Sequence, residues 1–255
     1  MSETPDFLDL DDGHRLAYHK SPGRSPGVMF LPGYMSDMEG SKAVELEAYC
    51  RLRGQAFLRF DYTGHGFSSG KFEDGTIGRW AADAVAALDR LTEGPQVLVG
   101  SSMGGWLMLL TALARPDRVA GLVGLAAAPD FTADLLPTQL PAEYWQAIRE
   151  KGVAYVPSPY GPDLTPFTKN LVEEAENQLI LRAEIPLDCP VRLLHGMEDP
   201  DVPWQTSLAI QEKLRSPDVV VTLIKDGDHR LSREEDLAKL ALTVGTLLED
   251  LEAEG

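Results

Sequence analysis

Cysteine is scarce in this chain, and long apolar runs are missing from it. The 255 residues include two cysteines, Cys50 and Cys189, each alone in its segment and without CxxC spacing. Neither a disulfide framework nor a thiolate metal site is indicated, and a reducing compartment fits best. No run of about 18 apolar residues occurs, and the acidic first residues lack the basic and apolar regions of a secretory signal. We therefore expect a soluble cytoplasmic protein without membrane insertion.

Basic residues are also few. Lys and Arg total 23 against 40 Asp and Glu, which gives a formal net charge of −17 at pH 7. Nucleic acids and anionic membranes attract surfaces of the opposite sign, so this balance disfavours both as partners. The remaining composition, 44% hydrophobic and 25% charged, is typical of a globular chain. Its length suits one large domain with an insertion.

Apolar segments of strand length alternate with segments of helical periodicity through most of the chain. A β-hairpin is predicted around the Asp12-Gly13 turn, ahead of this alternation. The pattern predicts an α/β fold with a mainly parallel sheet flanked by helices, formed by residues 1–128 and 191–255. Strands are predicted at 27–31, 55–60, 96–99, 119–126, 191–195 and 219–224, and helices at 42–53, 77–91 and 232–251.

The alternation stops between residues 129 and 190, after the sixth predicted strand. Seven prolines occur from Pro129 to Pro166, and two helices are predicted, one bracketed by Pro141 and Gly152 and one opening at Thr165. We interpret 129–190 as a small helical lid inserted into the core. A plain linker is the alternative, but linkers rarely carry so many aromatic and aliphatic side chains.

Four residues of this predicted lid are candidates for an apolar substrate pocket. Tyr144, Trp145 and Ile148 lie on the first predicted helix, and Phe167 lies on the second. The main sheet does not obviously cover these helix faces, so they could bind an acyl chain. The same side chains could equally well pack the lid onto the core.

The segment Gly100-Ser101-Ser102-Met103-Gly104 is the strongest functional signal. A buried strand leads into it and an apolar helix leads away, which is the setting of a nucleophile elbow. The two glycines leave room for neighbouring backbone, so that a strained turn can hold the Ser102 hydroxyl above the sheet edge. Ser102 is therefore the predicted nucleophile. The alternative is a serine that only caps the following helix.

A serine nucleophile needs a base, and the base needs an acid that fixes its tautomer. Asp199 follows the predicted strand 191–195, and His229 follows the last one. The order Ser, Asp, His, each after a different strand, matches the α/β-hydrolase order. Asp201 is the competing acid, but it looks like the entry to the next helix, where it would cap N–H groups. The other histidines, namely His14, His19, His65 and His195, are interpreted as structural.

The oxyanion formed when Ser102 attacks a carbonyl needs two preorganised donors. The backbone N–H of Met103 is one candidate, and that of Tyr34, in the loop after strand 27–31, is the other. The Pro32-Gly33 pair in that loop could also be no more than a turn.

Two glycine-rich stretches imitate nucleotide-binding motifs. Gly64-His-Gly66 follows a strand, but Ser69 stands where the third glycine of a dinucleotide fingerprint belongs. Ser69-Gly70-Lys71 resembles the end of a phosphate-binding loop, yet Phe72 replaces the hydroxyl residue that binds magnesium. We predict no nucleotide, other cofactor or metal.

These motifs together resemble the α/β-hydrolase superfamily. They are Gly100-x-Ser102-x-Gly104, Asp61-Tyr-Thr-Gly-His-Gly-x-Ser68, His195-Gly-x-x-Asp199-x-x-Val-Pro203 and Asp228-His229. More narrowly, Phe30-Leu-Pro-Gly-Tyr34, Val99 to Met108, Leu193 to Met197, Val202-Pro-Trp204 and Asp228-His-Arg230 are similar to the family of α/β-hydrolase domain-containing protein ten. The resemblance spans about residues 27–250. It implies acyl-protein thioesterase or acyl-glucuronide esterase activity, with Ser102, Asp199 and His229 as the triad.

The predicted function is a cofactor-free serine hydrolase that cleaves carboxylic esters or thioesters through an acyl-Ser102 intermediate. Its substrate would be a small molecule or an acylated protein. A peptidase or C–C bond hydrolase on the same fold is one alternative, and a non-catalytic ligand-binding protein is another. The sequence leaves open the choice between ester and thioester, the acyl chain length, the natural substrate and the oligomeric state.

Overall fold

The computed structural model describes residues 4–158 and 160–254. Within these ranges eight strands form one sheet, and from β4 to the far edge all neighbours run parallel. Only β1 and β2 run antiparallel to their neighbours. In spatial order the strands are β1 (Asp6–Asp9), β2 (Arg15–Ser21), β4 (Gln55–Phe60), β3 (Arg24–Leu31), β5 (Gln96–Ser101), β6 (Val119–Leu125), β9 (Val191–Gly196) and β10 (Val219–Ile224).

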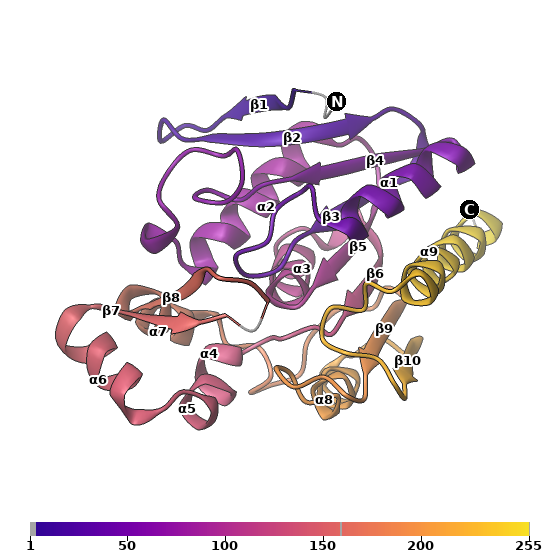
Figure 1. Ribbon diagram of the computed structural model, residues 1–255. Helices are drawn as coiled ribbons and strands as arrows, with labels where there is room; N and C mark the ends of the chain where they lie inside the picture. Colours follow the sequence, from indigo (N-terminus) through magenta and orange to yellow (C-terminus); the bar gives the residue numbers. More distant parts are fainter. Residues whose placement is uncertain (1–3, 159, 255) are drawn as a thin grey trace.

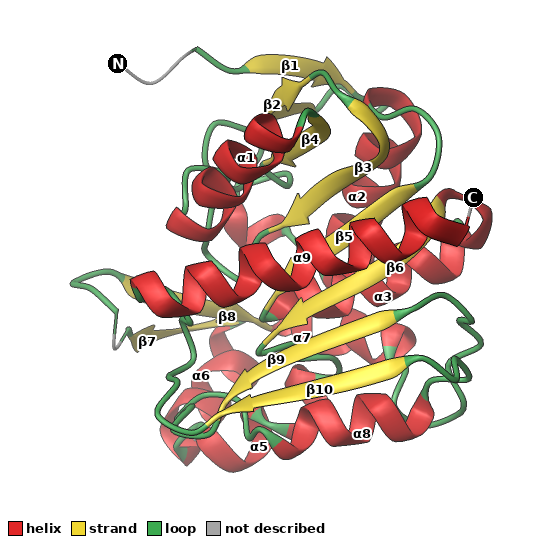
Figure 2. Cartoon of the chain, turned by 90° about the vertical axis from the view of Figure 1, so that its right-hand side faces the viewer, coloured by secondary structure: helices red, strands yellow, loops and turns green. Residues whose placement is uncertain are grey.

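Helices cover both faces of this sheet (Figure 2). One face carries α1 (Ser41–Arg53) and α9 (Glu234–Glu254), and the other carries α2 (Ile77–Leu91), α3 (Met103–Ala114) and α8 (Gln205–Lys213). Short 3₁₀ turns occur at Phe72–Asp74, Pro116–Arg118 and Glu176–Gln178. Among the helices that the structure describes, none combines the length and the hydropathy needed to cross a membrane.

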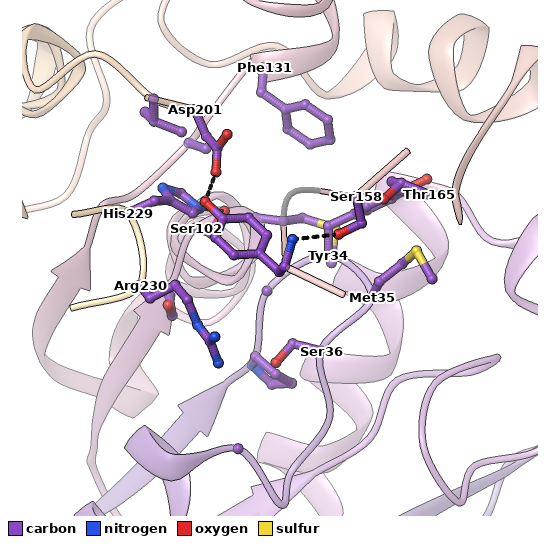
Figure 3. A pocket seen from close by; sticks show the side chains of 18 of the residues that line it. Tyr34, Met35, Ser36, Ser102, Phe131, Ser158, Thr165, Asp201, His229 and Arg230 are labelled. Carbon is purple, nitrogen blue, oxygen red and sulfur yellow. Dashed lines mark hydrogen bonds between the residues drawn. The ribbon is translucent and has the colours of Figure 1, made fainter. Parts of the chain in front are cut away.

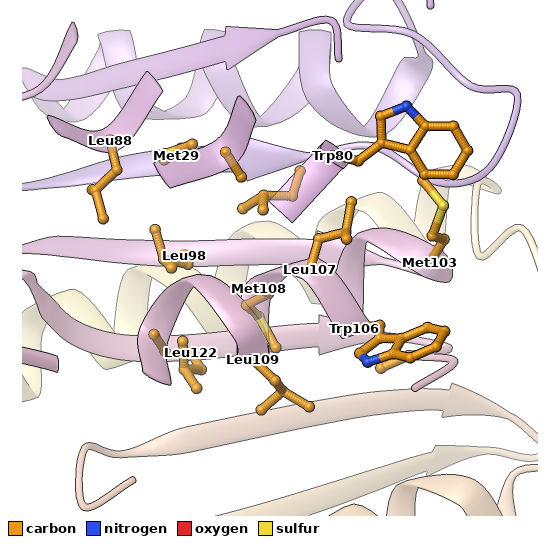
Figure 4. Packing of buried hydrophobic residues seen from close by; sticks show 14 of the residues in the cluster. Met29, Trp80, Leu88, Leu98, Met103, Trp106, Leu107, Met108, Leu109 and Leu122 are labelled. Atoms are coloured by element: carbon orange, nitrogen blue, oxygen red, sulfur yellow. The ribbon is translucent and has the colours of Figure 1, made fainter. Parts of the chain in front are cut away.

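Apolar side chains fill the space on each face of the sheet. All six residues of β5 are buried, as expected for a central parallel strand covered on both sides. On the α2 and α3 face, Trp80 and Trp106 are fully buried together with Met29 and Leu107 (Figure 4). Each such side chain contributes about 1.5–3 kcal/mol of transfer free energy. This packing fixes the strand ends that carry the candidate site.

Residues 129–190 form a separate layer beyond the carboxyl ends of the strands, which we call the insertion (Figure 1). It contains short helices and one antiparallel pair of strands, β7 with β8. Its elements are α4 (Phe131–Asp134), α5 (Leu136–Gln139), α6 (Ala142–Lys151), β7 (Val153–Pro157), β8 (Leu164–Thr168) and α7 (Lys169–Ala175).

The second helix predicted in this region does not begin where the sequence suggested. Residues 164–168 form strand β8, and α7 begins at Lys169 with Thr168 as its N-cap, whose side chain accepts the N–H of Leu171 at 3.0 Å. The prediction of a purely helical insertion is therefore wrong. The physical reason is the pairing with β7, a contact across the turn between the two strands that no local capping signal reveals.

A few polar contacts fasten the insertion to the core. The Asp130 carboxylate accepts the N–H groups of Ile180 and Leu181, both at 2.9 Å. The indole N–H of Trp106, on α3, donates to the carbonyl of Gln178 at 3.1 Å. Both contacts involve buried side chains, so breaking either would leave a polar group unsatisfied away from water.

Candidate active site

Ser102 occupies the sharp turn between β5 and α3. Its backbone angles, φ 55° and ψ −122°, lie in a region that residues other than glycine seldom adopt. Two backbone hydrogen bonds hold this conformation: Ser102 N–H donates to Leu125 at 2.9 Å, and its carbonyl accepts from Gly105 at 2.8 Å. The strained turn is therefore over-determined by its neighbours, as a nucleophile elbow requires.

Gly100 and Gly104 are needed because backbone approaches them closely. A Cβ on Gly100 would fall on the carbonyl oxygen of Gly104, and one on Gly104 would fall on that of Leu31. Both obstacles are backbone atoms that cannot rotate away. The spacing noticed in the sequence thus reflects a tight crossing of β5, α3 and the end of β3.

Ser102, His229 and Asp199 form one hydrogen-bonded chain (Figure 3). The Ser102 hydroxyl lies 3.0 Å from His229 Nε2, and His229 Nδ1 lies 2.8 Å from Asp199 Oδ2. A carboxylate only accepts hydrogen bonds, so Nδ1 carries the proton and Nε2 is free to accept from the serine. This is the geometry of a nucleophile, a general base and an orienting acid.

The structure separates the roles of Asp199 and Asp201. The Asp199 side chain is fully buried, and its Oδ1 accepts the N–H groups of Asp201 and Val202, both at 2.8 Å. Asp201 instead accepts the hydroxyl of Tyr160, from the insertion. The expectation that Asp201 caps the next helix is wrong, because α8 begins four residues later, at Gln205.

His195 contacts the same carboxylate, a role that the sequence analysis missed. Its Nε2 lies 3.2 Å from Asp199 Oδ2 and 3.0 Å from the carbonyl of Val202, while Nδ1 lies 2.7 Å from Ser207 Oγ. Two acceptors face Nε2, so Nε2 carries the proton and Nδ1 accepts from the serine hydroxyl. A histidine at the end of a buried strand, four residues before the acid, was the available signal.

The surroundings of Asp199 keep it ionised. Burial alone would raise its pKa, but the hydrogen bonds from His195 and His229 outweigh this and hold the pKa well below the usual range. The carboxylate is therefore charged at any pH where a neutral histidine base is present.

The two predicted oxyanion donors lie beside Ser102. Met103 is the first residue of α3, where no intrahelical acceptor exists for its N–H. The backbone of Gly33, next to Tyr34, packs against Ser102, since a Cβ on it would lie 3.3 Å from Ser102 Cβ. Both N–H groups come from elements that the core fixes, as preorganised stabilisation of an oxyanion requires.

The Tyr34 side chain ties this loop to the insertion. Its hydroxyl donates to the carbonyl of Pro166 at 2.5 Å, and its ring stacks on Phe167 with centroids 5.5 Å apart. Burial raises the pKa of the phenol, so it stays protonated and remains a donor. One residue therefore links strand β8 with the loop beside the nucleophile.

A cavity of about 600 Å³ opens above Ser102 and His229 (Figure 3). The insertion supplies an apolar wall that includes Phe131, Leu136 and Phe167. The size and the mixture of apolar surface with a few polar groups are typical of a small-molecule site.

The structure corrects three of the four predicted pocket residues. Phe167 lines the cavity, but Tyr144, Trp145 and Ile148 are not among the described residues that do. All three lie on α6, which packs against β7, and Ile148 is 2% exposed. The amphipathic face of α6 is therefore buried within the insertion, the alternative that the sequence had left open.

Asp199, Asp201 and His229 are also the kind of residues that bind metals, with ligand atoms within 4.8 Å of one another. Their atoms already have partners, however: His229 Nδ1 donates to Asp199, and Asp201 accepts from Tyr160. This pairing fits a proton-transfer site, and the absence of a metal remains a prediction.

Known proteins similar to this chain carry a common name. The mouse protein named palmitoyl-protein thioesterase ABHD10, mitochondrial, is 45% identical over 251 residues, covering 96% of this chain and 82% of its own length. The human protein of the same name is 44% identical over 246 residues, covering 96% of this chain and 80% of its own.

These names correct the expected location. The scarcity of cysteine and the acidic start of the sequence led to the prediction of a cytoplasmic protein, whereas the relatives are named as mitochondrial. The prediction is wrong on this comparison. Its physical basis was weak, because a low cysteine count reports a reducing compartment and does not distinguish one such compartment from another.

Solved structures and a family model agree with the fold. The mouse alpha/beta hydrolase domain-containing protein 10 matches with a TM-score of 0.90 and 43% identity, covering 98% of this chain and 100% of that one. A putative hydrolase from Agrobacterium vitis S4 matches with a TM-score of 0.90 and 38% identity, covering 96% and 98%. The model described as "Alpha/beta hydrolase family" matches residues 28–241. The predicted fold is confirmed, and the chain belongs to the alpha/beta hydrolase family.

Proposed function

We propose that this protein is a serine hydrolase that cleaves acyl thioesters and esters through an acyl-Ser102 intermediate. The observation that carries the proposal is the continuous hydrogen-bonded chain from Ser102 Oγ through His229 to Asp199, with distances of 3.0 and 2.8 Å. The thioesterase name of relatives at 44–45% identity supports the same chemistry.

Acylation begins when His229 Nε2 takes the proton of the Ser102 hydroxyl as Oγ attacks the substrate carbonyl carbon. The carbonyl oxygen becomes an oxyanion, which the N–H groups of Met103 and Tyr34 stabilise. As the intermediate collapses, the bond to the leaving sulfur or oxygen breaks. His229 Nε2–H then gives its proton to the departing thiolate or alkoxide.

Deacylation repeats these steps with water. His229 Nε2 takes a proton from the water as its oxygen attacks the acyl-serine carbonyl, and then returns a proton to Ser102 Oγ. The products are a carboxylic acid and the free enzyme. Asp199 keeps the imidazole in the required tautomer and stabilises its protonated form in both halves of the cycle.

The insertion serves as a lid that holds the acyl group. Phe131, Leu136 and Phe167 present an apolar wall to the cavity that contains Ser102. An aliphatic chain placed there would leave water, which contributes about 0.8 kcal/mol for each methylene buried. The proposed pocket therefore rests on Phe167 and its neighbours and no longer on α6.

The test is a panel of acyl thioesters and p-nitrophenyl esters of increasing chain length, with acyl anilides as amide controls. We expect turnover of thioesters and esters, no anilide cleavage, and complete loss of activity on labelling by a fluorophosphonate. Anilide cleavage at a comparable rate would favour a peptidase. Ligand binding without turnover or labelling would favour a binding protein and overturn the proposal.

A further inference from the structure

One wall of the cavity carries two cationic side chains, Lys42 and Arg230 (Figure 3 shows Arg230 beside Ser36). Arg230 directly follows the proposed base His229, and Lys42 lies at the start of α1. The Lys42 ammonium donates to the Arg230 carbonyl, so the two residues are neighbours. Both line the same cavity as Ser102.

Neither cation has a carboxylate partner. In the described part of the chain most other arginines form ion pairs, such as Arg192 with Asp218 at 2.8 Å, whereas no carboxylate lies within 4.0 Å of Arg230 or Lys42. The Arg230 guanidinium lies over the ring of Tyr160, 5.7 Å from its centroid. With 40 acidic residues available, leaving both cations unpaired at the reaction centre requires an explanation.

The acidic groups on the cavity do not compensate these charges. They are Asp37, Asp163 and Asp201. Asp201 accepts the Tyr160 hydroxyl, and Asp37 accepts the N–H of Glu39 at 2.9 Å. The wall near Lys42 and Arg230 therefore keeps a local positive charge.

Helix stability does not account for the position of Lys42. It lies in the first turn of α1, where the helix dipole disfavours a cation, and no acidic residue stands in that turn. Burial and, second, the charge of Arg230 lower the pKa of Lys42 to about 8. An anion bound between the two side chains would remove this repulsion.

The two walls of the cavity differ in chemistry. Ser36, Ser41 and Ser232 add hydroxyl groups to the cationic wall, and the insertion supplies the apolar wall, with Ser102 belonging to the same cavity. A substrate whose acyl chain occupies the apolar wall would thus direct its leaving group to the cationic one.

We propose that Lys42 and Arg230 form an anion subsite that selects thioester and ester substrates whose leaving group carries a carboxylate or a comparable anion near the scissile bond. This inference rests on the proposed function, because it requires that the cavity binds an acyl thioester or ester. It adds to that function a preference for the charge of the leaving group.

The test compares two octanoyl thioesters that differ in one group: the leaving thiol is 3-mercaptopropionate in one and the neutral, nearly isosteric 3-mercaptopropionamide in the other. Charge-assisted hydrogen bonds to the carboxylate should raise kcat/KM about tenfold over the amide, mainly through KM. High salt should reduce this ratio by screening. In Arg230→Gln and in Lys42→Gln the ratio should fall towards one.

Arg90→Gln is the matched control, because Arg90 is an exposed arginine on α2, outside the cavity, and should keep the wild-type ratio. Fluorophosphonate labelling and the Tm report whether each variant is folded. Equal kcat/KM for the two thioesters in the wild type would overturn the subsite and leave the proposed function standing. No turnover of either would instead count against the proposed function.

A third substrate distinguishes the two ends of the molecule. It carries the ω-carboxylated suberoyl group in place of octanoyl, on the neutral thiol. If the wild type prefers this acyl group over octanoyl and Arg230→Gln removes the preference, the cations read the acyl end, and our assignment to the leaving group is wrong.

Discussion

The carboxyl ends of β5, β9 and β10 and the insertion build the same cavity in different ways. Ser102, Asp199 and His229 follow strands that are paired on both sides or packed on the core, and each is hydrogen-bonded to another member of the set. The insertion reaches the cavity with side chains that stay partly in solvent, such as Tyr160 at 47% exposure and Leu164 at 50%.

This difference suggests a division of labour. Groups that transfer protons must be held to within a fraction of an ångström, and the parallel sheet provides that rigidity. Groups that bind an acyl chain need area and apolarity more than precision, and a thinly anchored layer can supply both. Changes at strand ends should therefore abolish chemistry, and changes in the insertion should alter selectivity.

The largest effect is expected at Ser102. Ser102→Ala removes the nucleophile and should lower kcat by at least about 10⁴-fold while the Tm stays near the wild-type value. Ser101→Ala, one residue earlier at the end of the same strand, is the matched control. An inactive Ser101→Ala alongside an active Ser102→Ala would show that the elbow has been assigned to the wrong serine.

Next in size is the loss of the orienting carboxylate. Asp199→Asn should lower kcat/KM by about 10⁴-fold, the loss seen for the equivalent change in serine proteases, because His229 can then adopt the wrong tautomer. Asp201→Asn retains an acceptor for Tyr160 and should stay within about tenfold of wild type. The reverse ranking in steady-state assays would contradict the geometry described above.

A third prediction concerns the stability of the loop after β4. His65 is 4% exposed, and burial lowers its pKa from 6.5 to about 4. The unfolded chain therefore binds a proton that the folded chain refuses between these pH values, so the unfolding free energy should fall as the pH drops from about 6.5 to about 4. The shift corresponds to about 3 kcal/mol.

His65→Phe keeps an aromatic ring beside Tyr62, Phe72 and Trp80 and cannot titrate. Urea unfolding at several pH values should show a shallower pH dependence for this variant. A dependence identical to that of the wild type would mean that His65 does not contribute.

The smallest effect is expected in the insertion. Phe167→Ala should raise KM for long-chain thioesters by about tenfold, with less effect on short chains, because it removes apolar surface from the cavity. Trp145→Ala on α6 should lower the Tm without changing the preference for chain length. A chain-length effect from Trp145→Ala and none from Phe167→Ala would restore the original pocket prediction.

The two regions also differ in how well the sequence predicts them. Strand 219–224 and helix 77–91 were located to the residue, since their hydrophobic patterns are local. Ser102, Asp199 and His229 were brought together by the chain order of strand ends, which a parallel sheet converts into proximity.

The failures all involve contacts between distant segments. Phe167 was placed on a helix because Thr165-Pro166 imitates a helix start, whereas pairing with β7 makes it a strand. Asp201 was expected to cap a helix, but its partner Tyr160 comes from the insertion. His195 was taken as structural because nothing local shows that a buried ring reaches Asp199.

The most direct test of the central claim is to observe the acyl-enzyme. Wild-type protein would be mixed with excess octanoyl thioester, quenched in acid after increasing times, and digested for peptide mass analysis. The account predicts an added octanoyl group on Ser102 that appears during turnover and decays once substrate is exhausted. Octanoylation of Cys50 or Cys189 instead, or full turnover with no acylated Ser102 at any time, would contradict it.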